Sequence, residues 1–231
     1  MKLEKITYDA ESRTKRRYED ACGTAHALEL VGERWALLVM RELMLGPKRF
    51  NDLKADLPGI SANVLTQRLE GLEEAGVVVR RKLPPPASVS VYELTPWGYE
   101  AAPIVEVLGR WAARSPRHDP TLPISAVSIM LSFRTMFSPE RAEGFSARVG
   151  FRLGRESFLA EVGDGRFSVA RADDLSGADA IFTGAPAALA AAVYGGQDFD
   201  MLAGEGALQV TGDRAAAERF RTLFVLPPKA A

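Results

Sequence analysis

The chain has 231 residues, a length that accommodates one large domain or two small ones. Hydrophobic residues make up 47% and charged residues 26%, as in ordinary soluble proteins, which excludes disordered, collagen-like and disulfide-rich classes. The formal net charge is -1, so DNA binding would require local clusters of positive charge rather than a generally basic chain.

The N-terminal region gives no sign of export. Its first 20 residues are charged throughout and lack the apolar stretch of a signal peptide, and no run of about 18 apolar residues follows. Cys22 is the single cysteine and cannot form an intramolecular disulfide. These features predict a cytoplasmic protein that does not associate with membranes.

Residues 21–114 carry the periodicity of a helical domain with one hairpin. The pattern predicts helices at 21–31 and 34–45, a short helix within 49–60, a helix at 61–75, strands at 77–83 and 88–94, and a long helix at 96–114. In the long helix, the apolar side consists of Ile104, Val107, Leu108 and Trp111. A short helix, a turn containing glycine, a second helix and a two-stranded ribbon are the successive parts of a winged helix-turn-helix.

The second helix of this pair is the predicted recognition helix. Leu65, Leu69 and Leu72 form its inward stripe, which leaves hydroxyl, amide and guanidinium groups on the outward face near its start. Cations that can neutralise phosphates open the preceding helix and line the first wing strand. The candidate DNA-binding residues are therefore Lys48, Arg49, Ser61, Asn63, Thr66, Gln67, Arg68, Arg80, Arg81 and Lys82. The alternative is that they are ordinary solvated surface groups, with the strand cations protecting a sheet edge.

A proline-rich segment at 115–124 predicts a linker between a domain at 1–114 and a second domain at 125–231. The second domain begins with a predicted helix at 125–137, and three strands joined by glycine-containing turns follow. A strand at 179–184, an alanine-rich helix at 185–195, a strand at 207–213 and a closing helix at 213–224 complete it. The predicted fold class is α+β, with a winged helix followed by an α+β domain built on a curved antiparallel sheet.

The second domain concentrates methionine and phenylalanine, whose thioether and aromatic groups suit an adaptable wall around a small hydrophobic ligand. Arg134 could meet a carboxylate of such a ligand. The candidate ligand-binding residues are Met130, Phe133, Arg134, Met136, Phe137, Phe151 and Phe158. The alternative is that the apolar members of this set fill the core.

The sequence lacks the common motifs of nucleotide, hydrolase and zinc-protease sites, so we predict no enzyme activity and no cofactor. A metal site is not expected, because Cys22 and His26 would need two further ligands. Cys22 remains a redox candidate, because His26 lies one helical turn away and could lower the pKa of the thiol. The alternative is an inert, buried cysteine.

The stretch from Cys22 to Trp111 resembles the HxlR-type winged-helix transcriptional regulators throughout, most clearly in VGERWALLVMRELMLGPKRFNDL, LPGISANVLTQRLEGLEEAGVV and YELTPWG. The resemblance implies a homodimer, formed through the N-terminal segment and the long helix after the wing, that binds a near-palindromic operator in double-stranded DNA. It also implies recognition by the helix at 61–75 and a wing tip around residues 84–90. Many such regulators carry a cysteine at the position of Cys22, and some use it to sense oxidants.

Residues 125–226 resemble the sterol carrier protein type 2 family, most clearly in IFTGAPAALAAAVYGG and GEGALQVTGDRAAAERFRTLF. That resemblance implies a hydrophobic tunnel for lipids or other apolar molecules. The function predicted is a DNA-binding transcriptional regulator controlled by a small hydrophobic ligand. The alternative is a carrier of apolar molecules whose winged helix serves mainly for dimerisation.

Overall fold

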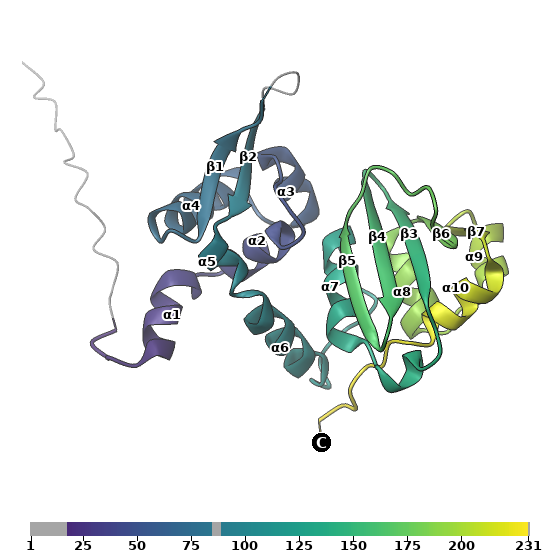
Figure 1. Ribbon diagram of the computed structural model, residues 1–231. Coiled ribbons are helices and arrows are strands. Elements are labelled where there is room, and N and C mark those ends of the chain that lie inside the picture. Colours follow the sequence, from purple (N-terminus) through teal and green to yellow (C-terminus); the bar gives the residue numbers. More distant parts are fainter. Residues whose placement is uncertain (1–17, 85–88, 231) are drawn as a thin grey trace, which may run out of the picture.

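The computed structural model describes residues 18–84 and 89–230. Figure 1 shows the winged-helix region beside a sheet that has helices packed against it. The elements of the first region are α1 (Gly23–Val31), α2 (Ala36–Leu43), α3 (Phe50–Asp56), α4 (Ala62–Glu74), β1 (Val78–Lys82), β2 (Ser90–Leu94), α5 (Pro96–Tyr99) and α6 (Ala102–Ala113). None of the helices in the described residues has the length and hydropathy needed to cross a bilayer.

The helix-turn-helix and wing are confirmed in the predicted order. Leu65, Leu69 and Leu72 of α4 are buried, as their spacing predicts, and the hydroxyl of Ser61 caps the helix by accepting a hydrogen bond from the amide of Val64 at 3.2 Å. Gly59, in the turn before α4, has a φ of 89°, a left-handed conformation that glycine adopts without strain. Strands β1 and β2 pair antiparallel. Part of the predicted wing tip, residues 85–88, lies outside the described residues.

The predicted single helix at 96–114 is wrong. The chain forms two helices, α5 and α6, separated by a turn at Glu100 and Ala101. Pro103 explains the break, because its ring lacks an N–H group and would clash with the carbonyl of residue 99 in a continuous helix. At the start of α6 the same proline is tolerated, since the first helical amides have no partner within the helix.

The second region is the predicted α+β domain. It contains α7 (Ala126–Met136), η1 (Glu140–Ala142), β3 (Ala147–Leu153), β4 (Glu156–Gly163), β5 (Arg166–Arg171), β6 (Ala180–Gly184), α8 (Pro186–Tyr194), α9 (Phe199–Gly204), β7 (Leu208–Gly212) and α10 (Arg214–Arg221). The sheet order is β5-β4-β3-β6-β7. The prediction contained no α9, a short helix that the carboxylate of Asp198 caps through the amides of Asp200 and Met201.

The sheet needs one correction, because it is mixed rather than wholly antiparallel. Strands β3, β4 and β5 form the predicted antiparallel meander, and β6 pairs antiparallel with β7. Strand β6, however, lies beside β3 and runs parallel to it. After β5 the chain crosses from one edge of the meander to the far side of β3, and this connection reverses the direction expected for a continued meander.

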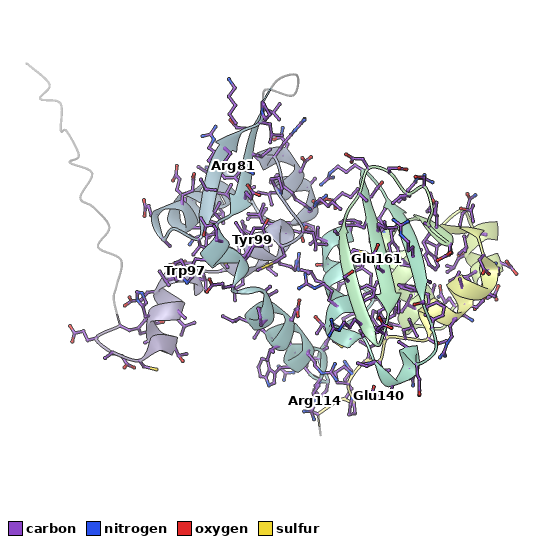
Figure 2. All side chains as sticks on the ribbon, in the orientation of Figure 1. Arg81, Trp97, Tyr99, Arg114, Glu140 and Glu161 are labelled. Atoms are coloured by element: carbon purple, nitrogen blue, oxygen red, sulfur yellow. The ribbon has the colours of Figure 1, made fainter. Side chains whose placement is uncertain are left out.

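One face of the sheet carries the core of this domain. Helices α7, α8 and α10 contact that face, and their apolar side chains meet alternate residues of β3, β4 and β6. The centre is a cluster of aromatic rings, which includes Phe133, Phe151, Phe182, Phe220 and Phe224. The opposite face of β3 and β4 carries charged residues such as Arg148 and Glu161, the latter labelled in Figure 2.

Candidate nucleic-acid interface and the contact between domains

The outward face of α4 presents polar side chains in the arrangement that the sequence predicts. Asn63, Thr66 and Gln67 are exposed on it, opposite the buried leucines. Their amide and hydroxyl groups can donate to and accept from base edges in a major groove. Ser61 is exposed as well, but its oxygen accepts the capping hydrogen bond that fixes the start of α4.

Arg68 faces a different partner from the one expected. Its Nη1 lies 3.2 Å from Oε2 of Glu33, and only 20% of its side chain is exposed. Glu33 belongs to the turn between α1 and α2. The ion pair therefore holds α4 against this turn, and in this arrangement the guanidinium of Arg68 is engaged within the protein.

The wing and the start of α3 supply the exposed cations. Arg80, Arg81 and Lys82 are exposed on β1, and Arg49 is exposed at the N-cap of α3. Arg81, labelled in Figure 2, forms an ion pair with Glu93 of the neighbouring strand. The guanidinium of Arg80 lies 5.8 Å from the ring centre of Tyr92. These cations belong to the wing and to the helix before α4, where they can contact phosphates on either side of a groove.

The prediction that Lys48 contacts DNA is wrong, because this residue is only 3% exposed. Its backbone forms an isolated antiparallel bridge with Tyr92 of β2 through two hydrogen bonds, with N–O distances of 3.0 and 2.8 Å. Its ammonium lies among three carboxylates, 2.9 Å from Glu42, 2.5 Å from Asp56 and 3.1 Å from Glu156.

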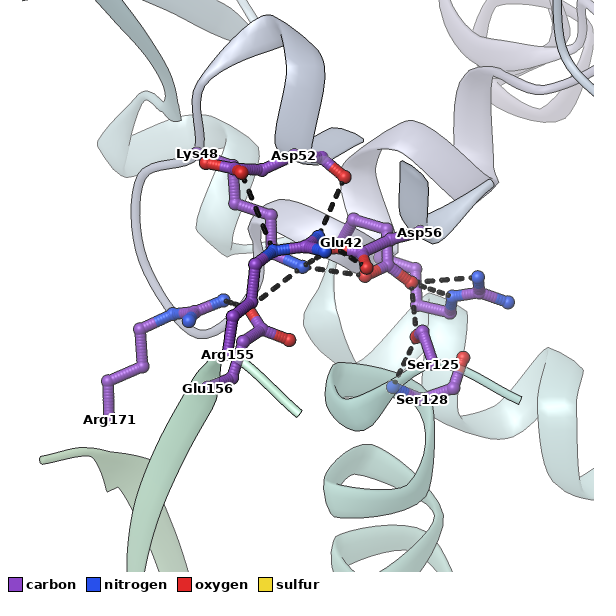
Figure 3. Close-up of polar contacts among 10 residues, drawn as sticks. Glu42, Lys48, Asp52, Asp56, Ser125, Ser128, Arg155, Glu156 and Arg171 are labelled. Carbon is purple, nitrogen blue, oxygen red and sulfur yellow. Dashed lines mark hydrogen bonds and ion pairs between the residues drawn. The ribbon is translucent and has the colours of Figure 1, made fainter. Parts of the chain in front are cut away.

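This Lys48 cluster joins the two domains (Figure 3). Glu156 opens β4 of the C-terminal domain, and its carboxylate lies 2.6 Å from the guanidinium of Arg171 on β5. Arg155 reaches across to α3, with Nη2 at 2.6 Å from Asp56. On the other side, the hydroxyl of Ser125 donates to Glu42 at 2.7 Å. The charges alternate in sign, and those of Glu42, Lys48 and Glu156 are almost completely buried.

Burial opposes the charged form of Lys48, but the negative charges of Glu42 and Glu156 and the hydrogen bonds to Asp56 and Glu42 outweigh it, so its pKa lies above the ordinary lysine value. Lys48 is therefore a stable cation that neutralises carboxylates from both domains. Sequence reasoning missed this role, because the members of the cluster are spread from residue 42 to residue 171 and share no local motif.

The predicted ligand cavity in the C-terminal domain is filled with protein side chains. Met130, Phe133, Met136, Phe151 and Phe158 are buried. The rings contact one another rather than a vacant space, so the structure supports the alternative that these residues form the core. Phe137 is half-buried at the edge of the cluster.

Arg134 also departs from its predicted role, because its Nη2 lies 2.8 Å from Glu106 on α6 rather than near the interior. An open hollow of about 640 Å³ lies elsewhere on the domain, where β3 begins, and its lining includes Arg148, Glu161, Arg166 and Ser168.

Comparison with known proteins decides the family. The model of the HxlR-like helix-turn-helix family matches residues 30–119. An uncharacterized HTH-type transcriptional regulator of Bacillus subtilis, YvaP, is 37% identical over 86 residues, which are 37% of this chain and 80% of YvaP. The chain belongs to the HxlR-like helix-turn-helix family. The HTH-type transcriptional regulator YodB of Bacillus subtilis is 36% identical over 86 residues, covering 37% of this chain and 77% of YodB.

The C-terminal half is also identified, because the model of the SCP-2 sterol transfer family matches residues 134–225. The two family models place an HxlR-like helix-turn-helix at residues 30–119 and an SCP-2 domain at residues 134–225. Among solved structures, reduced YodB from Bacillus subtilis is 33% identical and covers 42% of this chain and 98% of that one, with a TM-score of 0.38. Both of these relatives, YvaP and YodB, carry the name of HTH-type transcriptional regulators.

In this HxlR-like chain, Cys22 is exposed and sits at the N-cap of α1, so the alternative of a buried thiol is wrong. Backbone hydrogen bonds from Thr24 and Ala25 hold its pKa below the ordinary cysteine value, because amides at a helix start stabilise the thiolate. His26, the predicted cause, instead places Nδ1 3.2 Å from Glu29. Across residues 18–84 and 89–230, no group of three His, Cys, Asp or Glu side chains is placed to hold a metal ion.

The lowered pKa gives a testable pH dependence. A group that prefers its deprotonated form in the folded state begins to react at lower pH, so alkylation of Cys22 by iodoacetamide should rise at a lower pH in the native protein than in urea. The rate of adduct formation, measured by mass spectrometry across a pH series, checks this. Coincident native and unfolded profiles would contradict a folded-state effect at Cys22.

Proposed function

We propose that this protein is a cytoplasmic, homodimeric transcriptional regulator that binds a near-palindromic operator in double-stranded DNA. Residues 1–114 form the DNA-binding and dimerisation domain, residues 115–124 the linker, and residues 125–231 a domain that responds to a small hydrophobic molecule. The observation that carries the DNA-binding part is the exposed polar face of α4 beside the exposed cations of β1 and α3. The candidates retained for DNA contact are Arg49, Ser61, Asn63, Thr66, Gln67, Arg80, Arg81 and Lys82.

Dimerisation is supported by a second feature, the apolar stripe of α6. Ile104, Val107, Leu108 and Trp111 are 43–70% exposed and spaced to share one side of the helix. An exposed stripe of this kind marks a surface that another protein covers. A second copy of the chain is the natural occupant, because a two-fold dimer places two recognition helices at half-sites about one helical turn, roughly 34–36 Å, apart.

DNA binding is tested by fluorescence anisotropy with the DNA upstream of the protein's own gene. We expect the variant Asn63→Ala with Gln67→Ala to bind at least about tenfold more weakly, since each amide-to-base contact contributes about 1–3 kcal/mol of discrimination. In a salt series, the logarithm of wild-type affinity should fall linearly with the logarithm of salt, with a slope of about -0.9 per phosphate neutralised.

The matched control is Gln209→Ala, an exposed amide on β7 of the C-terminal domain, which should bind the operator as the wild type does. A scrambled duplex of equal length measures non-specific binding. If the Asn63 and Gln67 variant retained full preference for the operator, α4 would not be the recognition helix.

Control by a hydrophobic molecule is supported by the SCP-2 domain and by its contacts with α6. Arg110 of α6 donates to the carbonyl of Thr135 at 3.0 Å, and Glu106 pairs with Arg134 of α7. A change in the C-terminal domain can therefore reach the helix proposed to set the spacing of the recognition helices. A coupling free energy of about 1–3 kcal/mol would change occupancy five- to about a hundredfold.

The rival function is a carrier of apolar molecules whose winged helix mainly dimerises. The variant with Asn63→Ala and Gln67→Ala separates the two functions. A carrier would keep its full function in this variant, whereas a regulator would lose operator binding and still take up apolar molecules.

A further inference from the structure

The aromatic core of the C-terminal domain is completed by a residue from outside its helices and main strands. The ring of Phe224 stacks on Phe133, with centroids 4.4 Å apart and an interplanar angle of 25°. It also lies 4.9 Å from Phe220 and 5.5 Å from Phe167, and the residue is 5% exposed. Phe133, Phe167 and Phe220 belong to α7, β5 and α10, whereas Phe224 belongs to residues 223–230, which we call the tail segment.

The tail segment connects this core to the end of α6 (Figures 1 and 2). After Phe224, the amide of Val225 donates to the carbonyl of Met136 at 2.8 Å. The ammonium of Lys229 then donates to the carbonyls of Ala113 and Ser115, both at 3.1 Å. Arg114, labelled in Figure 2, exchanges two hydrogen bonds with the segment, to the carbonyl of Pro228 and from the amide of Ala230. A cation on the last carbonyls stabilises a helix end, so the tail segment caps α6.

We propose that the space occupied by the phenyl group of Phe224 is a binding site for a small aromatic molecule, which displaces Phe224 and thereby releases the tail segment from α6. The stacked position on Phe133 favours a flat ring over an acyl chain, because aromatic pairs gain energy beyond the area that they bury. The rings that contact Phe224 carry no charge, so the ligand is an uncharged one.

Displacement is easier for Phe224 than for the other rings. Removing Phe133, Phe151 or Phe220 would require a helix or strand to move, with loss of its backbone hydrogen bonds. Near Phe224, the tail segment is held to the domain by three backbone hydrogen bonds, in which the amide of Ser138 donates to Leu223, that of Leu223 to Phe220 and that of Val225 to Met136. Segments with few such bonds open locally at low free-energy cost. The half-buried Phe137 and Phe167 mark the edge of the cluster at which a ligand would enter.

The test uses indole as the probe and the full chain, with binding followed by calorimetry. Phe224→Ala should bind indole at least about tenfold more tightly than the wild type, because the ligand no longer competes with the chain's own ring. Leu226→Ala is the matched control, since this tail residue is 42% exposed and lies outside the ring cluster; its affinity should equal that of the wild type. Phe224→Leu, which leaves a smaller space, should lie between them and serves if the alanine variant unfolds.

The release of the tail segment has its own readout. Saturating the wild type with indole should speed hydrogen exchange at the amides of Val225 and Ala230, which are the two tail amides bonded to Met136 and Arg114. In Phe224→Ala these amides should already exchange fast without ligand.

If the wild type and Phe224→Ala bound indole with equal affinity, or if neither bound it, the proposed binding site at Phe224 would be overturned. Tighter binding of decanoate than of indole would overturn the aromatic class in favour of an acyl chain. An unchanged rate of hydrogen exchange at the amide of Ala230 in the indole complex would overturn the proposed release of the tail segment from α6. The inference rests on the proposed function only for its consequence at the operator, and no DNA enters these measurements, so its failure and that of DNA binding are distinguishable.

Discussion

Replacing Trp111 with glutamate is expected to separate the proposed dimer into monomers and to abolish tight operator binding. Trp111 is 70% exposed on the α6 stripe, beside Val107. Truncating a central aromatic residue of an interface commonly costs at least about 2 kcal/mol, and burying a carboxylate there costs more. The dimer dissociation constant, measured by sedimentation equilibrium, should therefore rise at least about thirtyfold. Operator affinity should fall with it, because two half-sites are then no longer bound by one linked unit.

The matched control introduces the same charge on the same helix. A Cβ at Gly109, which lies off the apolar stripe, would meet no atom within 4 Å, so Gly109→Glu should leave the dimer intact. Circular dichroism should give both variants the wild-type helix content, because neither position is buried within one chain. If Trp111→Glu sedimented as a dimer at wild-type concentrations, the α6 stripe would not be the dimer interface.

The fold was predictable where a local pattern has one physical outcome. The leucine stripe of α4, its Ser61 cap and the paired wing strands all follow from spacing and residue type. The break before α6 was also encoded locally, in Pro103, but the apolar stripe from Ile104 to Trp111 lies entirely after the break and does not reveal where the helix begins. The parallel pairing of β6 with β3 was not encoded locally, because strand partners across a long connection depend on the packing of the whole domain.

The exposed polar face of α4 could be predicted from the sequence, but the ion pairs of Arg68 and Lys48 could not. Asn63, Thr66 and Gln67 are outward because their neighbours at helical spacing are leucines. In the sequence, Lys48 and the exposed Arg49 are adjacent cations with no local signal to distinguish them. In the structure, the backbone bridge to Tyr92 and the three carboxylates around its ammonium hold Lys48 in a buried position. Likewise, regular spacing of Met and Phe does not reveal whether they line a cavity or fill a core, since both arrangements bury the same side of a helix.

Replacing Lys48 with methionine has the largest expected effect on stability. The change keeps the length of the side chain and removes the charge, so the carboxylates of Glu42, Asp56 and Glu156 would face one another. Breaking a buried ion pair by removing one partner typically costs about 3–5 kcal/mol. We expect the free energy of unfolding, measured by urea denaturation at neutral pH, to fall by that amount.

The sign of the pH dependence distinguishes this effect from a simple packing defect. In the wild type, the raised pKa of Lys48 means that its stabilising contribution is complete below the ordinary lysine pKa and is lost only as the pH rises through the higher folded value. Lys48→Met lacks this contribution at every pH. The deficit should therefore be constant up to neutral pH and shrink as the pH rises through the folded pKa of Lys48, whereas a packing defect would persist.

The control for Lys48→Met is Lys54→Met on α3, a half-buried lysine outside the Lys48 cluster, whose effect should stay within about 0.5 kcal/mol. Adding Glu42→Gln to Lys48→Met should recover part of the loss, because it removes one of the three negative charges that Lys48 neutralises in the wild type. Equal effects at positions 48 and 54 would contradict the view that Lys48 neutralises carboxylates from both domains. A large, pH-dependent loss at Lys48 alone would mean that the contact between the domains is held by charge, since Glu156 and Arg171 bring the SCP-2 domain to the winged helix at this point.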